Sequence, residues 1–481
     1  MSKLLRPFSS LLLLCLLYAR PADGYSLLTH EQLIDLTWDA SIVPLLKSRY
    51  PTLTAAQLEH ARAYAYGGCV IQDIGYYPFG DTFYSNLTHY VRSGDFVVNL
   101  FRNAGNADEL AFAIGALSHY IGDNIGHADA TNLAVPVEFP KLGQKYGHSV
   151  RYAEGGSQHV RTEFGFDINE ISHAHFAPAH YLSHVGLQVP QRQLELAFYQ
   201  TYGLAEDFSK GKGNRVNVKA YRFAVRTFIP RIAFSVNLLH RHKEPPVVDS
   251  PELQRLTTEL ADIAAKNDWA AYRRKAGVGT YTLAGFLYIL PKVGALSLVA
   301  VKGPTVDTDR EYLRSVLRST DALNFTLRRF TPPSTSAGTA AAAAKDVNSQ
   351  SPPSDPLSAK PGSAQAVPRG SSDPQHPLRN RDLDTGSIVR PAGYPLTDAT
   401  YCKLVHRLTA KPAQAVPPGI KEDILAYYAD LNLPFATKSQ PSSWRTLQAD
   451  LATLSAMPTS NEPLPYPTYG PEGDPTESPA P

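Results

Sequence analysis

The stretch AFAIGALSHYIGDNIGHADATN, residues 111–132, carries His119, Asp123 and His127 at successive four-residue steps. Four residues return to nearly the same side of an α-helix, so the three side chains form one polar ridge. Imidazole and carboxylate groups on one ridge suit Zn²⁺, although surface or core histidines can show the same spacing. The stretch therefore predicts a long central helix and makes these three residues candidate metal ligands.

Further candidate ligands lie on both sides of this helix. His159 and Glu163, in QHVRTEF, are again one helical turn apart. Asp73 and His89 flank a segment rich in glycine, proline and aromatic residues, and His30 lies near the start of the chain. Together these residues supply more ligands than one tetrahedral zinc can use, which predicts a cluster of ions.

The N-terminus has the pattern of a secretory signal peptide. Residues 1–24 contain a basic start, an apolar run at residues 11–19, and the small residues Ala22 and Gly24 at the spacing of a cleavage site. Cleavage there would make Tyr25 the first residue, and its free α-amino group could bind a metal. We therefore expect a secreted or periplasmic protein.

Composition limits the class of function. After loss of residues 1–24 the basic and acidic residues are equal in number, which argues against a strong nucleic-acid footprint. Cys15 leaves with the signal peptide, and Cys69 and Cys402 are far apart in sequence. We therefore expect no disulfide framework, and rigidity must come from packing and metal.

Helical periodicity predicts an all-α fold with low-complexity segments near its end. The very apolar run at residues 281–301 contains Pro291, which favours a buried helical hairpin, although contact with a lipid surface is an alternative. The helices near the C-terminus could dock on the main body or form a separate unit. The predicted parts are a signal peptide (1–24), a main domain (25–245), a helical extension (246–330), a disordered linker (331–395), a short helical segment (396–457) and a disordered Pro-rich tail (458–481).

In this order the motifs resemble the zinc-dependent phospholipase C family, whose relatives include the P1/S1-type nucleases and the N-terminal domain of glycosylphosphatidylinositol-specific phospholipase D. The likeness is carried by His-Tyr-x-Gly-Asp at residues 119–123, the His159 and Glu163 pair, and the residues upstream of them. It covers roughly residues 25–245. The resemblance implies a phospholipase C-like helical bundle with three zinc ions in a cleft.

The resemblance also implies a role for each candidate residue. One zinc would be bound by Asp73, His89, His119 and Asp123, and Asp123 would bridge to a second zinc. Asp73 would in addition act as the general base. The second zinc would take the Tyr25 amine and carbonyl, His30 and Asp123, and the third would take His127, His159 and Glu163.

One departure from the family pattern concerns the third zinc. In phospholipase C and the nucleases the second histidine of the central motif lies ten residues after the first, and a proline lies two before it. Here His127 lies eight residues after His119, as in the phospholipase D domain, and Asp129 occupies the tenth position. An eight-residue step stays in phase on one helix, so His127 is the predicted ligand and Asp129 the substitute.

The predicted reaction is hydrolysis of a phosphodiester in a phospholipid head group by metal-activated water, with peripheral contact to the membrane. One alternative is a P1/S1-type nuclease, in which Tyr76, Tyr77, Phe79 and Phe83 would stack on bases. A second alternative is a secreted, metal-stabilised binding module without turnover.

Overall fold

The predicted signal peptide, Tyr25 and nearly all of the predicted tail lie outside the residues that the structure describes. The computed structural model describes residues 26–76, 80–173, 181–184, 188–206, 208, 218, 222, 229–239, 250–265, 273–275, 277–289, 303–330 and 378–460.

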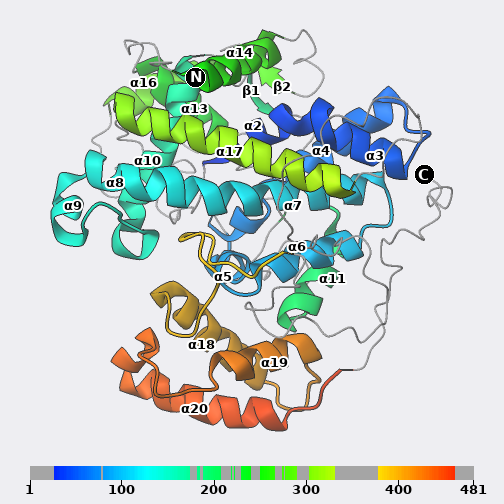
Figure 1. Ribbon diagram of the computed structural model, residues 1–481, viewed down its shortest axis with the longest axis vertical. Coiled ribbons are helices and arrows are strands. Elements are labelled where there is room, and N and C mark those ends of the chain that lie inside the picture. Colours follow the sequence, from blue (N-terminus) through cyan, green and yellow to red (C-terminus); the bar gives the residue numbers. More distant parts are fainter. Residues whose placement is uncertain are drawn as a thin grey trace, which may run out of the picture.

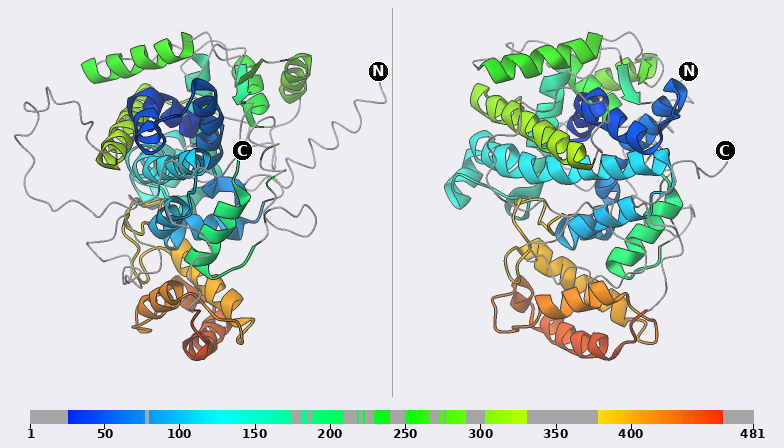
Figure 2. Two further views of the ribbon diagram at one scale, coloured as in Figure 1. Left: turned by 90° about the vertical axis from the view of Figure 1, so that its right-hand side faces the viewer. Right: turned by 45° about the vertical axis from the view of Figure 1, so that its right-hand side comes forward.

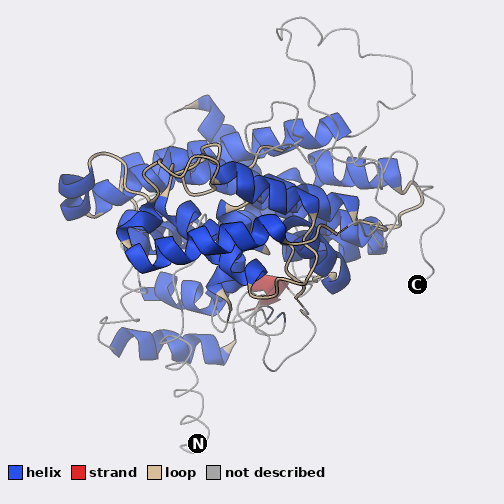
Figure 3. Cartoon of the chain, turned by 90° about the horizontal axis from the view of Figure 1, so that it is seen from below, coloured by secondary structure: helices blue, strands red, loops and turns tan. Residues whose placement is uncertain are grey.

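Helix α7 (Ala107–Gly126) lies at the centre of the molecule (Figure 1). Among the helices that pack against it are α2 (Leu27–Thr37), α4 (Ala55–Gly68), α6 (Ser93–Arg102) and α17 (Val306–Phe330). Figure 3 shows that helices make up nearly all the regular structure, which confirms the predicted all-α class.

The start of α7 follows from its sequence. The Asn106 side chain accepts a hydrogen bond from the Glu109 backbone N–H at 3.0 Å, and Asp108 and Glu109 in the first turn complement the helix dipole. Leu110, Ile114 and Leu117 along one face are fully buried.

Two glycines allow α4 and α7 to approach at the level of their backbones. A Cβ atom on Gly115 would lie 2.2 Å from the Ala65 carbonyl oxygen, and one on Gly68 would lie 2.1 Å from that of Phe112. This contact brings the end of α4 against the part of α7 that carries His119.

Further helices and turns complete this part of the molecule. Those up to residue 202 are η1 (Trp38–Ile42), α3 (Val43–Arg49), η2 (Gln72–Gly75), α5 (Thr82–Tyr90), η3 (His127–Thr131), α8 (Asn132–Glu138), α9 (Pro140–Tyr146), α10 (Tyr152–Ser172) and α11 (Gln191–Tyr202). They are followed by α13 (Ile229–Leu239), α14 (Pro251–Ala265) and α16 (Val278–Ile289). Strands β1 (Tyr181–His184) and β2 (Arg273–Lys275) pair antiparallel.

Part of the predicted apolar hairpin is described. Its first half lies in α16, which packs against α13, and residues 290–302 lie outside the described residues. Among the described helices, none combines the length and the apolar character needed to cross a bilayer.

The C-terminal helices dock on the main body. They are α18 (Pro395–Thr409), α19 (Pro418–Tyr427), η6 (Ala436–Ser439) and α20 (Pro441–Ala456). Helix α18 contacts α5, and α19 contacts α11. Figures 1 and 2 show these helices together at one end of the molecule.

The end of the predicted linker is ordered. Residues 331–377 lie outside the described residues, but residues 378–394 form turns that pack against the main body (yellow in Figure 1). Leu383 and Asp384 in these turns are fully buried. The linker prediction of 331–395 therefore runs too far, because large apolar residues return to the sequence at Leu378.

Candidate metal centre

The structure brings eight of the nine predicted metal ligands into three buried groups. Tyr25 is outside the described residues. The ligand atoms within each group lie within 4.8 Å of one another, and all eight side chains are buried. The first group is Asp73 with His89 and His119, the second is His30 with His119 and Asp123, and the third is His127 with His159 and Glu163.

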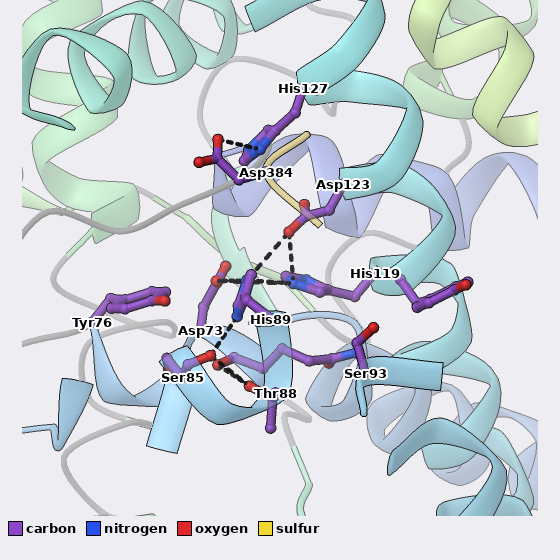
Figure 4. Close-up of polar contacts among 12 residues, drawn as sticks. Asp73, Tyr76, Ser85, Thr88, His89, Ser93, His119, Asp123, His127 and Asp384 are labelled. Carbon is purple, nitrogen blue, oxygen red and sulfur yellow. Dashed lines mark hydrogen bonds and ion pairs between the residues drawn. The ribbon is translucent and has the colours of Figure 1, made fainter. Parts of the chain in front are cut away.

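The first group is completed by Asp123 and has four potential ligand atoms (Figure 4). His89 Nε2 lies 3.3 Å from Asp73 Oδ1 and 3.3 Å from Asp123 Oδ2. His119 Nε2 lies 3.1 Å from Asp123 Oδ2, 3.9 Å from Asp73 Oδ1 and 3.4 Å from His89 Nε2. Ligands at zinc distances of 2.0–2.2 Å on a tetrahedron are about 3.3–3.6 Å apart, so this cage has the size that zinc requires.

Backbone carbonyls fix which nitrogen of each imidazole is available. His89 Nδ1 lies 2.7 Å from the Ser85 carbonyl oxygen, and His119 Nδ1 lies 3.0 Å from that of Cys69. A carbonyl only accepts hydrogen bonds, so both Nδ1 atoms carry the proton of the neutral ring. The two Nε2 lone pairs therefore face each other and two carboxylates, an arrangement that a shared cation or additional protons must stabilise.

The electrostatics of this group favour added positive charge. Burial lowers the pKa of His89, but Asp123 and Asp73 outweigh it and the pKa is raised well above its usual value. Burial alone would raise the pKa of Asp123, whereas His119, His30 and His89 bring it well below its usual range. The site thus keeps a carboxylate charged and attracts a proton or a metal ion.

The second group uses the other oxygen of Asp123. His30 Nε2 lies 3.2 Å from Asp123 Oδ1, and the His30 ring stacks on His119 with 4.2 Å between centroids. Asp123 thus presents one oxygen to His30 and the other to His89 and His119, as a bridging ligand would.

Helix α10 holds the start of α2, the helix that carries His30, through the side chain of Asp167. Asp167 on α10 accepts hydrogen bonds from the backbone N–H groups of Leu28 and Thr29, at 3.0 and 3.1 Å. The Thr29 hydroxyl also donates to Asp167, at 2.8 Å. This cap fixes the first turn of α2, which is buried along its whole length.

The third group combines α10 with the end of α7. His159 Nδ1 lies 2.7 Å from Glu163 Oε1, and His127 Nε2 lies 3.6 Å from the same oxygen. Burial and the nearby His127 lower the pKa of His159 to about 3, so its ring is neutral at physiological pH. Three protein ligands leave room for a further ligand, which is typical of catalytic zinc.

At residues 127–129 the structure places His127, and not Asp129, in the third group. Residues His127–Thr131 form the π-helical turn η3, a widening that is frequent at functional sites. Asp129 instead pairs with Arg318 of α17 and is partly exposed. The substitute ligand predicted at position 129 is therefore absent from the third group.

Two residues next to the third group were missed by the sequence analysis. Asp384 Oδ1 lies 3.2 Å from His127 Nδ1, a contact drawn as a dashed line in Figure 4. Asn132 Oδ1 lies 2.7 Å from His159 Nε2. Neither residue stands three or four positions from a ligand of the three groups, so helical spacing does not identify them. The one available signal was compositional, since RNRDLDTGSIV at residues 379–389 is charged and partly apolar after a long Pro/Ser/Ala-rich stretch.

The site residues fit zinc by their chemistry as well as by their spacing. The three groups consist only of imidazoles and carboxylates, ligands that zinc accepts. Within the described residues, both cysteines, Cys69 and Cys402, are free thiols and take no part in these groups.

Comparison with known proteins gives one match. Residues 29–206 match a family model described as zinc dependent phospholipase C. This range contains all eight described candidate ligands. No curated protein and no solved structure matches the chain significantly.

Proposed function

Because residues 29–206 belong to the zinc-dependent phospholipase C family, we propose that this protein is a secreted phosphodiesterase that hydrolyses phospholipid head groups. The observation that carries the proposal is the double use of Asp123, whose two oxygens face two adjacent ligand groups. Structural zinc sites rarely need such a shared carboxylate, whereas multi-metal hydrolytic centres use it.

Three zinc ions would be held by the nine predicted ligands. Asp73, His89, His119 and Asp123 would hold the first; His30, Asp123 and the Tyr25 amine and carbonyl the second; His127, His159 and Glu163 the third. When bound, zinc supplies Lewis acidity toward a phosphodiester oxygen and toward water.

The chain itself supplies orientation and a proton acceptor. Asp73 faces His89 and His119 through Oδ1, so its second oxygen can accept a proton from the attacking water. The carbonyls of Ser85 and Cys69 keep Nε2 of both histidines directed into the centre. Burial of these groups keeps bulk water from screening the charge that develops on phosphorus.

A nuclease on the same site is less well supported. Tyr76 and Phe83, two of the four aromatics considered for base stacking, are only 3% exposed. Phe83 is also covered by Lys403 and Arg407 of α18. Tyr77 and Phe79 lie outside the described residues.

The test is hydrolysis by purified, zinc-loaded protein. Vesicles of phosphatidylcholine, phosphatidylethanolamine or phosphatidylglycerol and single-stranded RNA are offered separately. We expect diacylglycerol and a phosphorylated head group, lost with chelator and restored by zinc. Phosphatidic acid would indicate D-type cleavage, and release of nucleotides alone would favour the nuclease. Inactivity on every substrate with zinc bound would favour the binding module.

A matched pair of variants links any activity to the centre. Asp73→Asn keeps the size of the side chain but removes the proposed base, so activity should be lost. Asp129→Asn changes the same residue type outside the ligand groups and should retain activity. Equal activity of the two variants would contradict the role of Asp73.

Export and the Tyr25 ligand are tested together. Mass spectrometry of the protein recovered from outside the expressing cell should show Tyr25 as the first residue. A mature chain that starts elsewhere would remove the amine from the proposed second zinc site.

A further inference from the structure

Asp384 is a buried carboxylate that lies outside the family-matched residues and touches the third ligand group. It is fully buried and belongs to the turns of residues 378–394. Its Oδ1 lies 3.2 Å from Nδ1 of His127. That nitrogen is on the other side of the ring from Nε2, which is the atom nearest Glu163. Asp384 thus faces His127 from outside the ligand group.

The same turn also reaches His159 through Asn132. The Asn132 side-chain amide donates from Nδ2 to the Asp384 carbonyl oxygen at 2.8 Å. Its Oδ1 must then accept from His159 Nε2, at 2.7 Å. This leaves the His159 Nδ1 lone pair directed at Glu163. One turn therefore contacts both histidines of the group, one directly and one through an amide.

The carboxylate of Asp384 is itself held in place. The Tyr394 hydroxyl donates to Oδ2, and the Tyr152 backbone N–H donates to Oδ1 at 3.4 Å. Asp382 accepts hydrogen bonds from the backbone N–H groups of Asp384 and Thr385, at 3.1 and 3.2 Å, which closes the turn. The position of Asp384 is thus fixed by both side chains and backbone.

The turn is also anchored to α5, α6 and α7, of which α5 and α7 carry ligands of the other groups. The Leu383 backbone N–H donates to the His89 carbonyl at 3.1 Å. The Ser93 hydroxyl donates to the Arg381 carbonyl at 2.6 Å, and the Tyr120 hydroxyl donates to that of Arg379. Residues 378–394 are therefore bound to α5, α6 and α7, next to the centre.

We propose that Asp384 is a positioning residue of the third zinc site, supplied by a segment beyond the family domain. In this role the Asp384 carboxylate, 3.2 Å away, pairs with Nδ1 of His127, which orients the ring and leaves Nε2 as a ligand. Carboxylates that hold metal-bound imidazoles in this way change metal affinity by 10–100-fold. The inference rests on zinc binding at the third group, which is part of the proposed function.

The test compares zinc binding by variants of the full chain. Zinc is counted by elemental analysis, and the site that is lost in Glu163→Gln is titrated against a chromophoric chelator. Asp384→Ala should weaken that site about 10–100-fold. Asp384→Asn, which keeps an acceptor oxygen without the charge, should show a smaller loss. Glu163→Gln, which lacks a ligand of this site, gives the reference for a lost third zinc.

A control separates positioning from folding. Asp423 is a buried carboxylate of the C-terminal segment that accepts a hydrogen bond from Tyr401 at 2.7 Å and belongs to no ligand group. Asp423→Ala should keep the third zinc even if it lowers the unfolding temperature. The proposal is overturned if Asp384→Ala binds the third zinc as tightly as wild type, if Asp423→Ala weakens it equally, or if wild type holds no third zinc. Because zinc is counted without substrate, the result does not depend on which phosphodiester is cleaved.

Discussion

His89 and His119 direct their Nε2 atoms at each other across 3.4 Å, while each donates from Nδ1 to a backbone carbonyl. Two neutral imidazoles in this orientation have opposing lone pairs, and two protonated ones would have opposing charges. A cation bound between them and the two adjacent carboxylates resolves both conflicts. The fold therefore keeps these lone pairs and carboxylates close together, and this arrangement destabilises the folded state when no cation or added proton is present.

Removal of metal should lower stability for this reason. A ligand that binds the native state alone contributes about 4 kcal/mol when its free concentration is 1,000 times Kd. We expect a lower unfolding temperature in chelator, restored by Zn²⁺ and not by Mg²⁺, which prefers oxygen ligands. Differential scanning calorimetry measures both effects. An unfolding temperature that is the same with and without chelator would contradict this expectation.

Asp123→Asn should affect two zinc sites at once, because the two oxygens of Asp123 face different ligand groups. We expect zinc affinity and hydrolysis to fall by more than the roughly 100-fold seen for residues that only orient ligands. Asp129→Asn, six residues later and paired with Arg318, is the matched control. Loss of a single zinc with the rest of the centre intact would show that Asp123 does not bridge.

Gly115→Ala should destabilise the protein by about 1–3 kcal/mol, the usual cost of overpacking. The added methyl would lie 2.2 Å from the Ala65 carbonyl oxygen and would force α4 away from α7. Gly279→Ala in α16 meets nothing within 4 Å and should stabilise by about 0.4–1 kcal/mol. Urea unfolding of both variants checks the signs, and a neutral effect of Gly115→Ala would disprove the close approach.

Asp167 gives the stability a specific pH dependence. Burial raises its pKa from 3.8 to about 6, despite hydrogen bonds from Ser26, Leu28 and Thr29. The folded state therefore binds the proton more tightly, and this stability is complete below pH 4 and is lost as pH rises through 6. The shift corresponds to about 3 kcal/mol.

The Asp167→Asn variant isolates this contribution. Its side chain stays neutral, so the wild-type free energy of unfolding minus that of the variant should fall between pH 4 and pH 7. Urea unfolding at each pH measures the difference. A difference that grows with pH would reverse the assigned direction of the shift.

Much of the site could be predicted from sequence because its ligands follow local rules. His119, Asp123 and His127 keep helical spacing on α7, and His159 and Glu163 keep it on α10. Asp384 follows no such rule, because 252 residues separate it from Asn132 and its contact depends on how a non-helical turn packs. The π-helical turn η3 was also beyond prediction, since it depends on tertiary packing rather than on propensity.

The proposed function requires that these buried imidazoles and carboxylates bind zinc. Anomalous diffraction at the zinc absorption edge, from crystals of the zinc-loaded protein, would locate the ions. We predict one peak among Asp73, His89, His119 and Asp123, a second beside His30 and Asp123, and a third among His127, His159 and Glu163. Crystals that show the same side-chain arrangement without anomalous density at these positions would contradict the proposed function.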